Sequence, residues 1–316
     1  MVNFFPTPYP DELLYSNLTR YHIRSGNRSF KQTLFEVLGY FPQQLCNLDL
    51  PNNLQSLISH TPVSTKFNVE DVIYNSTLYP FYKIFLTQPE AFLLKDLMKK
   101  KVGKPIFQVA KIAVIERDVH GQFLRFCDQC LEEDLQKYGE AYWHRTHQVP
   151  GVLVCLEHEK LLNDSLVPLQ DGYLGCYLAS QVTCQIRSIS LDSKESTLRQ
   201  LIAIAKEIKW LCDNHFNFRG FQWLRKQYQS HLVDQGFVSD SSSKVFKFHE
   251  EKFWNDISSV YGHECLNLLL PNLEGHGGRY FYRCLFACDI EPFIDRVAHV
   301  LLIQFLLKSL NVLLEG

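Results

Sequence analysis

Long apolar runs are missing from this chain of 316 residues. The longest covers residues 297–307, about half of the roughly 20 apolar residues that a membrane-spanning helix needs, so it predicts a buried helix. The first residues contain no basic leader followed by an apolar core, which argues against a secretory signal. We therefore expect a cytoplasmic protein without membrane contact, whose ten cysteines stay reduced.

The usual catalytic motifs are also missing. The sequence has no phosphate-binding G-x-x-x-x-G-K-S/T loop, no Gly-rich dinucleotide loop, no nucleophile elbow and no H-E-x-x-H pair. His144 and His147, near Glu140, could suggest a zinc hydrolase, but without the glutamate-containing motif we favour a packing or hydrogen-bonding role for both. These absences predict a protein that is not an enzyme.

An excess of one charge sign is the third feature that the chain lacks. Lys and Arg number 32 and Asp and Glu 34, a net charge of -2, which argues against coating nucleic acid by bulk attraction. Local basic groups remain candidates for phosphate contacts: Lys99, Lys100, Lys101, Lys104, Arg219, Arg225 and Lys226. The alternative for the lysine run is a solvated helix end, where cations complement the helix dipole.

What the sequence does contain is a pair of metal-ligand motifs within residues 125–161. Cys127-x-x-Cys130 and Cys155-x-x-His158 have the spacing with which two tight knuckles surround a tetrahedral Zn²⁺. Three thiolates and one imidazole fill all four positions, so no position is left for water or substrate. The motif therefore predicts one structural zinc ion.

A second zinc site is an alternative that the spacing allows. Cys212-x-x-His215 and Cys284-x-x-x-Cys288 are each acceptable ligand pairs, although they lie far apart in the sequence. Cys284 and Cys288 stand among apolar residues, where thiols pack as small hydrophobic groups. We expect a single site.

Helical periodicity runs through most of the chain. Asp11 and Glu12 are predicted to open a first helix that ends at residues 25–27, and Ser29 with Gln32 forms a capping-box pattern for a second. Such a pair is compatible with a helix-turn-helix or with any small helical bundle. Further helices are predicted at residues 52–59, 69–86, 89–100, 131–138, 196–212, 249–261 and 292–310, and strands at residues 123–126 and 151–154.

The predicted fold class is mainly α with a small zinc-ribbon or zinc-finger module. We divide the chain into a helical, helix-turn-helix-like domain (residues 1–105), a zinc-finger module (106–165), an irregular connection that has room for one hairpin (166–200) and a C-terminal helical domain (201–316), which could hold a second helix-turn-helix.

Several stretches resemble the TniQ/TnsD family of transposition target-selection proteins. They are NFFPTPYPDELLYSNLTR (residues 3–20), DVIYNSTLYPFY (71–82), RFCDQC (125–130), KYGEAYWHRTHQVPGVLVC (137–155), CLEHEKL (155–161) and PFIDRVAHVLLIQFL (292–306). The departures are Asp128 and Leu156, where the family tends to have proline, and Glu159, where glycine is usual. They alter the knuckle turns and leave the four ligands in place.

The resemblance implies a helix-turn-helix domain, a zinc finger with Cys127, Cys130, Cys155 and His158 as ligands, and a role in choosing where a Tn7-like or CRISPR-associated transposon inserts. Family members recruit the AAA+ ATPase TnsC. Some read an attachment site in DNA, and others dock on an RNA-guided Cascade complex, often as a homodimer. The sequence leaves both modes open. A zinc-ribbon transcriptional regulator that acts on DNA alone is the alternative function.

The metal-ligand motif generates a first prediction. Cys130→Ser should unfold the zinc module, because a structural Zn²⁺ contributes roughly 10–16 kcal/mol of apparent binding free energy. Metal analysis and thermal melting of the purified variant measure this. Full zinc content with unchanged melting would contradict the prediction.

Overall fold

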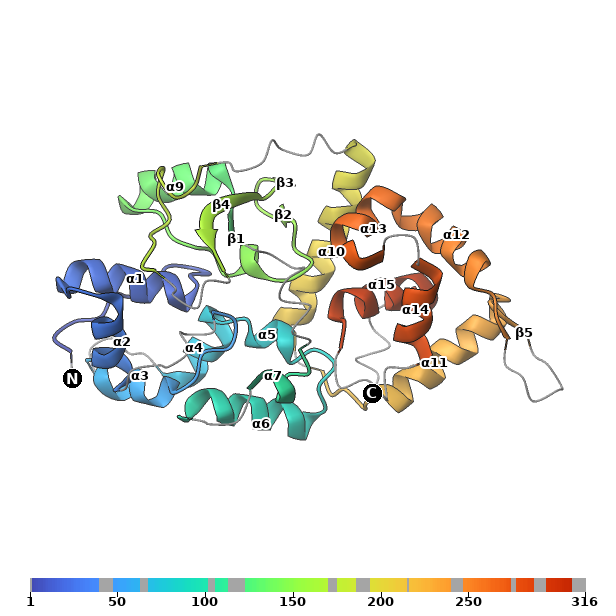
Figure 1. Ribbon diagram of the computed structural model, residues 1–316, viewed down its shortest axis with the longest axis horizontal. Coiled ribbons are helices and arrows are strands. Elements are labelled where there is room, and N and C mark those ends of the chain that lie inside the picture. The colour runs from blue at the N-terminus through green and yellow to red at the C-terminus, as the bar shows by residue number, and fades with distance from the viewer. Residues whose placement is uncertain are drawn as a thin grey trace.

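Helices dominate the computed structural model, which describes residues 2–39, 48–62, 68–101, 106–112, 123–169, 175–185, 194–214, 216–239, 247–273, 277–286 and 294–308. In Figure 1, α1 to α7 (residues 14–109) lie on the left, β1 to β4 and α9 (residues 123–168) above them, and α11 to α15 (residues 221–307) on the right, with α10 (residues 195–213) between the two halves. Mainly helical structure is confirmed for this part of the chain.

The described helices are α1 (Leu14–Ser25), α2 (Phe30–Leu38), α3 (Leu54–His60), α4 (Val69–Ser76), α5 (Tyr79–Tyr82), α6 (Gln88–Lys99), α7 (Ile106–Val109), α9 (Asp128–Tyr138), α10 (Glu195–Asp213), α11 (Phe221–Asp234), α12 (Glu250–Tyr261), α13 (His263–Leu269), α14 (Gly277–Phe286) and α15 (Arg296–Leu307). The described strands are β1 (Phe123–Phe126), β2 (Val154–Cys155), β3 (Lys160–Leu161), β4 (Asn163–Pro168), β5 (Val238–Ser239) and β6 (Lys247–Phe248).

The first two helices form as their caps predict, with two differences. Ser29 Oγ accepts the backbone N–H of Gln32 at 3.2 Å, which confirms the N-cap of α2, but the Gln32 side chain bonds the N–H of Arg28 and not that of Ser29. The predicted start of α1 is wrong by about one turn. Asp11 has a φ of 56° and α1 begins at Leu14, because Glu12 is used for a buried ion pair.

Three other predicted boundaries differ from the structure. The helix expected over residues 69–86 divides into α4 and α5, because Thr77 between them is extended, with φ −127° and ψ 172°. The last helix begins at Arg296, where Asp295 Oδ1 caps the N–H of Ala298 at 2.8 Å. The strand expected at residues 151–154 shrinks to β2.

The strands of the described residues form two-stranded antiparallel sheets. β1 pairs with β4 and β2 with β3, which gathers residues 123–168 into one unit, here called the Cys–His module. β4 extends past residue 165 into the connection that the sequence predicts to be irregular, because its pairing partner is about 40 residues earlier in the chain. β5 pairs with β6 beside α12.

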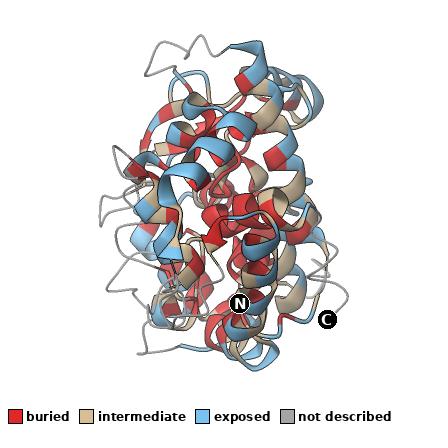
Figure 2. Cartoon of the chain, turned by 90° about the vertical axis from the view of Figure 1, so that its right-hand side faces the viewer, coloured by how far each residue is buried: buried red, intermediate tan, exposed pale blue. Residues whose placement is uncertain are grey.

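Helix α10 connects the parts of the molecule. One face is fully buried, including Leu201, Ile204 and Ile208, and α10 packs against α5, α13, α15 and β2. The Cys–His module approaches it at Gly151, where a Cβ atom would lie 2.7 Å from Ile208 Cδ1 and 2.9 Å from Val297 Cγ2. Only glycine permits this approach. Figure 2 shows the buried residues along the interior of the chain and the exposed residues around it.

Arg296 ties the C-terminal helices to the N-terminal ones. Its guanidinium is buried and donates to the carbonyls of Ile84 at 3.1 Å, Tyr82 at 2.8 Å and Ala110 at 2.6 Å. Helix α15, predicted as buried, is almost entirely inside the core. No helix of the described residues combines the length and apolarity needed to cross a membrane.

A buried ion pair ties the N-terminal segment to the Cys–His module. Glu12 Oε2 and Arg20 Nη1 are 2.7 Å apart, with side chains 0% and 2% exposed, and Arg20 Nε donates to Glu140 of the module at 2.8 Å. Burial raises the pKa of the Glu12 carboxyl, and Arg20 opposes that shift. Backbone bonds add to the link, from Leu13 N to Trp143 O at 2.9 Å.

This pair generates a second prediction. Arg20→Met should lower the free energy of unfolding by about 3–5 kcal/mol, because it leaves Glu12 charged and unpaired in the interior. The raised pKa of Glu12 means that its contribution favours folding below its unfolded-state pKa and is lost as pH rises through its folded-state pKa. Because Arg20 lowers the pKa of Glu12, its removal raises that pKa further, so Glu12 of the variant is protonated more readily and the deficit should shrink from about pH 8 to about pH 5.

Urea unfolding of wild type and variant at both pH values measures the deficit. Arg199→Met is the matched control, because Arg199 and Glu195 form an ion pair that is 71% and 83% exposed. A loss at Arg20 no greater than at Arg199 would contradict the prediction, as would an equal deficit at both pH values.

Candidate metal centre

The four predicted ligands lie on two knuckles of the Cys–His module. β1 leads into Cys127, which precedes α9, and Cys130 is in the first turn of that helix. β2 ends at Cys155, and the turn into β3 carries His158. Glu159 in this turn has a φ of 49°, in the left-handed region that favours glycine, which explains why glycine suits this position.

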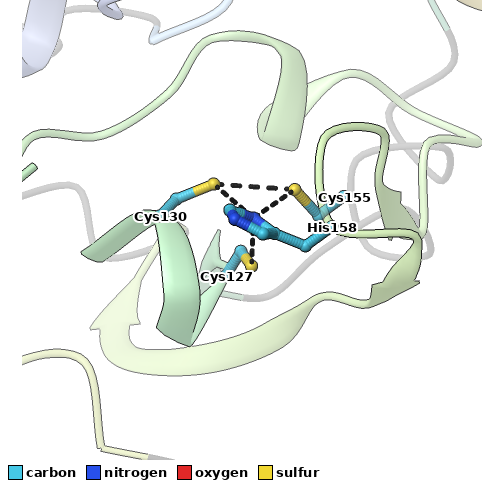
Figure 3. Close-up of side chains that lie close together, drawn as sticks. All are labelled: Cys127, Cys130, Cys155 and His158. Carbon is cyan, nitrogen blue, oxygen red and sulfur yellow. Dashed lines mark hydrogen bonds between the residues drawn. The ribbon is translucent and has the colours of Figure 1, made fainter. Parts of the chain in front are cut away.

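The ligand atoms of these side chains all lie within 4.8 Å of one another (Figure 3). The His158 Nδ1 atom is 3.5 Å from the Cys127 sulfur, 3.3 Å from that of Cys130 and 3.5 Å from that of Cys155, and the last two sulfurs are 3.6 Å apart. Bonds of about 2.3 Å to sulfur and 2.0–2.1 Å to nitrogen in a tetrahedron place sulfur atoms about 3.8 Å apart, and sulfur and nitrogen about 3.5 Å apart. The donor set therefore suits a tetrahedral metal ion.

Glu133 orients the imidazole ligand. His158 Nε2 is 3.0 Å from Glu133 Oε1, so an Nε2–H that donates to this carboxylate leaves the Nδ1 lone pair facing the sulfurs. Burial lowers the pKa of His158, but the hydrogen bonds with Glu133 and Cys155 outweigh it and raise the pKa to about 9. Groups that favour a proton on this ring also favour a metal cation beside it.

The three thiols are buried and electrostatically coupled. Hydrogen bonding with Cys127 and Cys130 lowers the pKa of Cys155, while the same contacts with Cys127 and Cys155 raise the pKa of Cys130. One thiolate is thus favoured at the expense of its neighbours. A divalent cation removes this competition, because it allows all three sulfurs to be thiolates.

A surrounding set of contacts fixes the two knuckles. Gln148 braces β1 by accepting the N–H of Arg125 at 3.0 Å and donating to its carbonyl at 2.8 Å. The Arg125 guanidinium donates to the carbonyls of Val152 and Val149 in the loop between the knuckles. Lys160 bonds both carboxylate oxygens of Asp128, which joins the first knuckle to the second. None of these partners carries a signal in the sequence, because each depends on the folded loop.

A family model described as TniQ matches residues 3–162, half of the chain. The chain belongs to the TniQ family. The matched residues include α1 to α7 and all four candidate ligands.

One relative of this TniQ-family chain is the Transposon Tn7 transposition protein TnsD of Escherichia coli, 30% identical over 158 residues. The match covers 50% of this chain and 31% of TnsD, so it spans about a third of that relative's length. The TniQ/TnsD resemblance seen in the sequence is confirmed.

His144 and His147, the other two candidate metal-ligating histidines, do not belong to the group of four ligands. His144 Nε2 is 2.8 Å from Asp134 Oδ2, and that contact outweighs burial and raises the pKa of His144. His147 is 5% exposed, and burial lowers its pKa to about 3. The hydrogen-bonding role expected for His144 is present.

The second zinc site stays a prediction. His215 and Cys288 lie outside the described residues. Cys212 is buried in the apolar core, where burial raises the pKa of its thiol to about 12, and Cys284 is half-buried. Within the described ranges, the Cys127 group is the one cluster whose donor atoms meet.

Several of the basic residues predicted to contact phosphate groups form interactions within this TniQ-family chain. Lys99 pairs with Glu70, and Lys100 with Asp96 at 2.7 Å, as the helix-end interpretation expects. Arg225 Nη2 donates to the carbonyl of Phe286 at 2.8 Å, and Arg219 lies 5.9 Å over the Trp223 ring. Lys101 and Lys226 are exposed, and Lys104 lies outside the described residues.

The metal centre generates a third prediction. Glu133→Ala should weaken zinc binding by about 10–100-fold, because the imidazole loses the partner that fixes its tautomer. Competition with a chromogenic chelator measures the affinity. Glu132→Ala, at the exposed neighbouring position, is the matched control and should bind zinc as the wild type does. Equal affinities for the two variants would contradict the role of Glu133.

Proposed function

We propose that this chain is a target-selection adaptor of a transposon, which couples a recognised target to recruitment of the AAA+ regulator TnsC. The observation that carries the proposal is the TniQ match over residues 3–162, the part that builds the N-terminal helices and the Cys–His module. The similarity to a Tn7 transposition protein supports it. The target is attachment-site DNA or an RNA-guided Cascade complex.

The candidate centre supports a structural Zn²⁺ and a protein that is not an enzyme. Cys127, Cys130, Cys155 and His158 would hold the ion, and four protein donors fill a tetrahedron, leaving no position for a substrate. The bound ion would supply rigidity to the two knuckles. The side chains of Gln148 and Arg125 near the candidate site form hydrogen bonds with backbone groups. Their role is structural in this proposal.

Rigid coupling between the parts suits an adaptor. The Glu12–Arg20–Glu140 contacts fix the N-terminal helices to the Cys–His module, and Gly151 places that module against α10 and α15. We assign the TnsC-facing surface to the N-terminal helices and the module. The region after residue 200 meets DNA or the guide complex, with Arg219 and Lys226 as phosphate contacts, in a monomer or a homodimer.

The fourth prediction tests this function. The zinc-loaded chain should retain TnsC from the same transposon in a pull-down when target DNA or the guide complex is present. Failure to retain TnsC under both conditions would reject the adaptor role. In a gel shift, a transcriptional regulator would instead bind its operator unaided, with a steep loss of affinity as salt rises.

A further inference from the structure

A cleft of about 910 Å³ lies beside the candidate metal centre. It is lined by residues 8–11 before α1, by residues of α4 and α9, by residues 142 and 144–147, and by residues 155–157. Lys209 of α10 also lines it. The cleft thus joins three parts of the chain that are far apart in sequence.

Aromatic rings line this cleft in a connected series. Tyr9 lies 4.2 Å from Tyr138 and 5.0 Å from Tyr142, measured between ring centroids. The Tyr142 ring stacks on His144 at 4.3 Å, and His144 lies 4.8 Å from His147. The faces of aromatic rings can pack against an extended peptide and bind cationic groups. Tyr9 already shows this chemistry, since the Arg20 guanidinium lies 3.8 Å over its ring.

His147 is a mostly buried polar side chain that lines the cleft. It is 5% exposed, and its ring makes no hydrogen bond to any residue that the structure describes. Its low pKa of about 3 keeps it neutral, with one N–H donor and one acceptor nitrogen. Neither nitrogen is among the fully buried, partnerless atoms of the described residues, so the ring reaches the cleft, where a ligand can meet it. A peptide group offers the matching acceptor and donor.

The charge of the lining selects the sign of the ligand. Five carboxylates line the cleft, those of Asp11, Asp71, Glu133, Asp134 and Glu157, against three permanent cations, Lys137, Arg145 and Lys209. Most of these groups are paired on both sides: Asp11 with Arg145 at 3.1 Å, Asp134 with His144 at 2.8 Å, Glu133 with His158 at 3.0 Å and Lys209 with Asp213 at 2.5 Å. The carboxylates of Asp71 and Glu157 and the ammonium group of Lys137 are not in these ion pairs. Asp71 and Glu157 are exposed at the rim. This lining repels phosphate and attracts a cationic side chain.

We propose that this cleft binds an extended segment of a partner protein that carries an arginine or lysine side chain. His147 hydrogen-bonds the peptide backbone of the segment, and the rim carboxylates and tyrosine faces receive its cationic side chain. The inference rests on the proposed function in one respect, since an adaptor must dock a protein partner.

A peptide selection tests the proposal. Random peptides of about 12 residues, displayed on phage, are selected against the zinc-loaded full chain, and enriched peptides are synthesised for fluorescence anisotropy. We expect them to contain arginine or lysine and to bind His147→Phe and Glu157→Lys at least about tenfold more weakly than wild type. Glu251→Lys, an equal charge change at an exposed position on α12, should bind as wild type does.

Three outcomes would overturn the proposal: no enrichment, enrichment of acidic or neutral peptides only, or unchanged binding by both cleft variants. Binding of a DNA duplex that both variants abolish would also overturn it. Thermal melting and zinc content check that each variant folds. If His147→Phe does not fold, Glu157→Lys decides alone. The TnsC pull-down tests the adaptor role separately, and its failure leaves this measurement unchanged.

Discussion

The ion pair between Glu12 and Arg20 is the contact on which the arrangement of the N-terminal half depends. Two charges that are almost completely buried carry a desolvation penalty, and such a pair persists only where further hydrogen bonds satisfy it. Here the Glu12 carboxylate also accepts the backbone N–H of Tyr9, the hydroxyl of Ser16 and the amide of Asn17. The segment before α1 is thereby held in one path, along one wall of the cleft and against Glu140 of the Cys–His module.

The Cys–His module connects the N-terminal segment to the C-terminal helices. Its two knuckles lie at the ends of a loop that Arg125 and Gln148 hold by backbone hydrogen bonds. Gly151 in that loop contacts α10 and α15, and Glu159 beside the second knuckle pairs with Lys206 of α10 at 2.9 Å. A metal ion that fixes the knuckles would therefore affect the packing of the C-terminal helices as well. Such coupling suits a protein that connects two recognition events.

The acidic, aromatic cleft and the exposed basic residues have opposite chemistry. Carboxylates and tyrosine faces beside the Cys–His module favour a cationic peptide. Arg219, just before α11, and Lys226, within it, carry the charge that phosphate groups require. This division agrees with the proposed adaptor, in which one part of the chain docks a protein and another meets nucleic acid. It is also consistent with the near-neutral net charge of the whole chain.

Local patterns in the sequence determined much of this protein. The spacing of Cys127, Cys130, Cys155 and His158 predicts a metal centre because knuckle turns are short, and the caps and periodicity place most helices because they act within a turn or two. Tertiary structure alone decided the rest. The contact of Glu133 with His158, the cleft around His147 and the pairing of β1 with β4 bring together residues that are distant along the chain. Their positions follow from packing and burial, which leave no short-range pattern in a sequence.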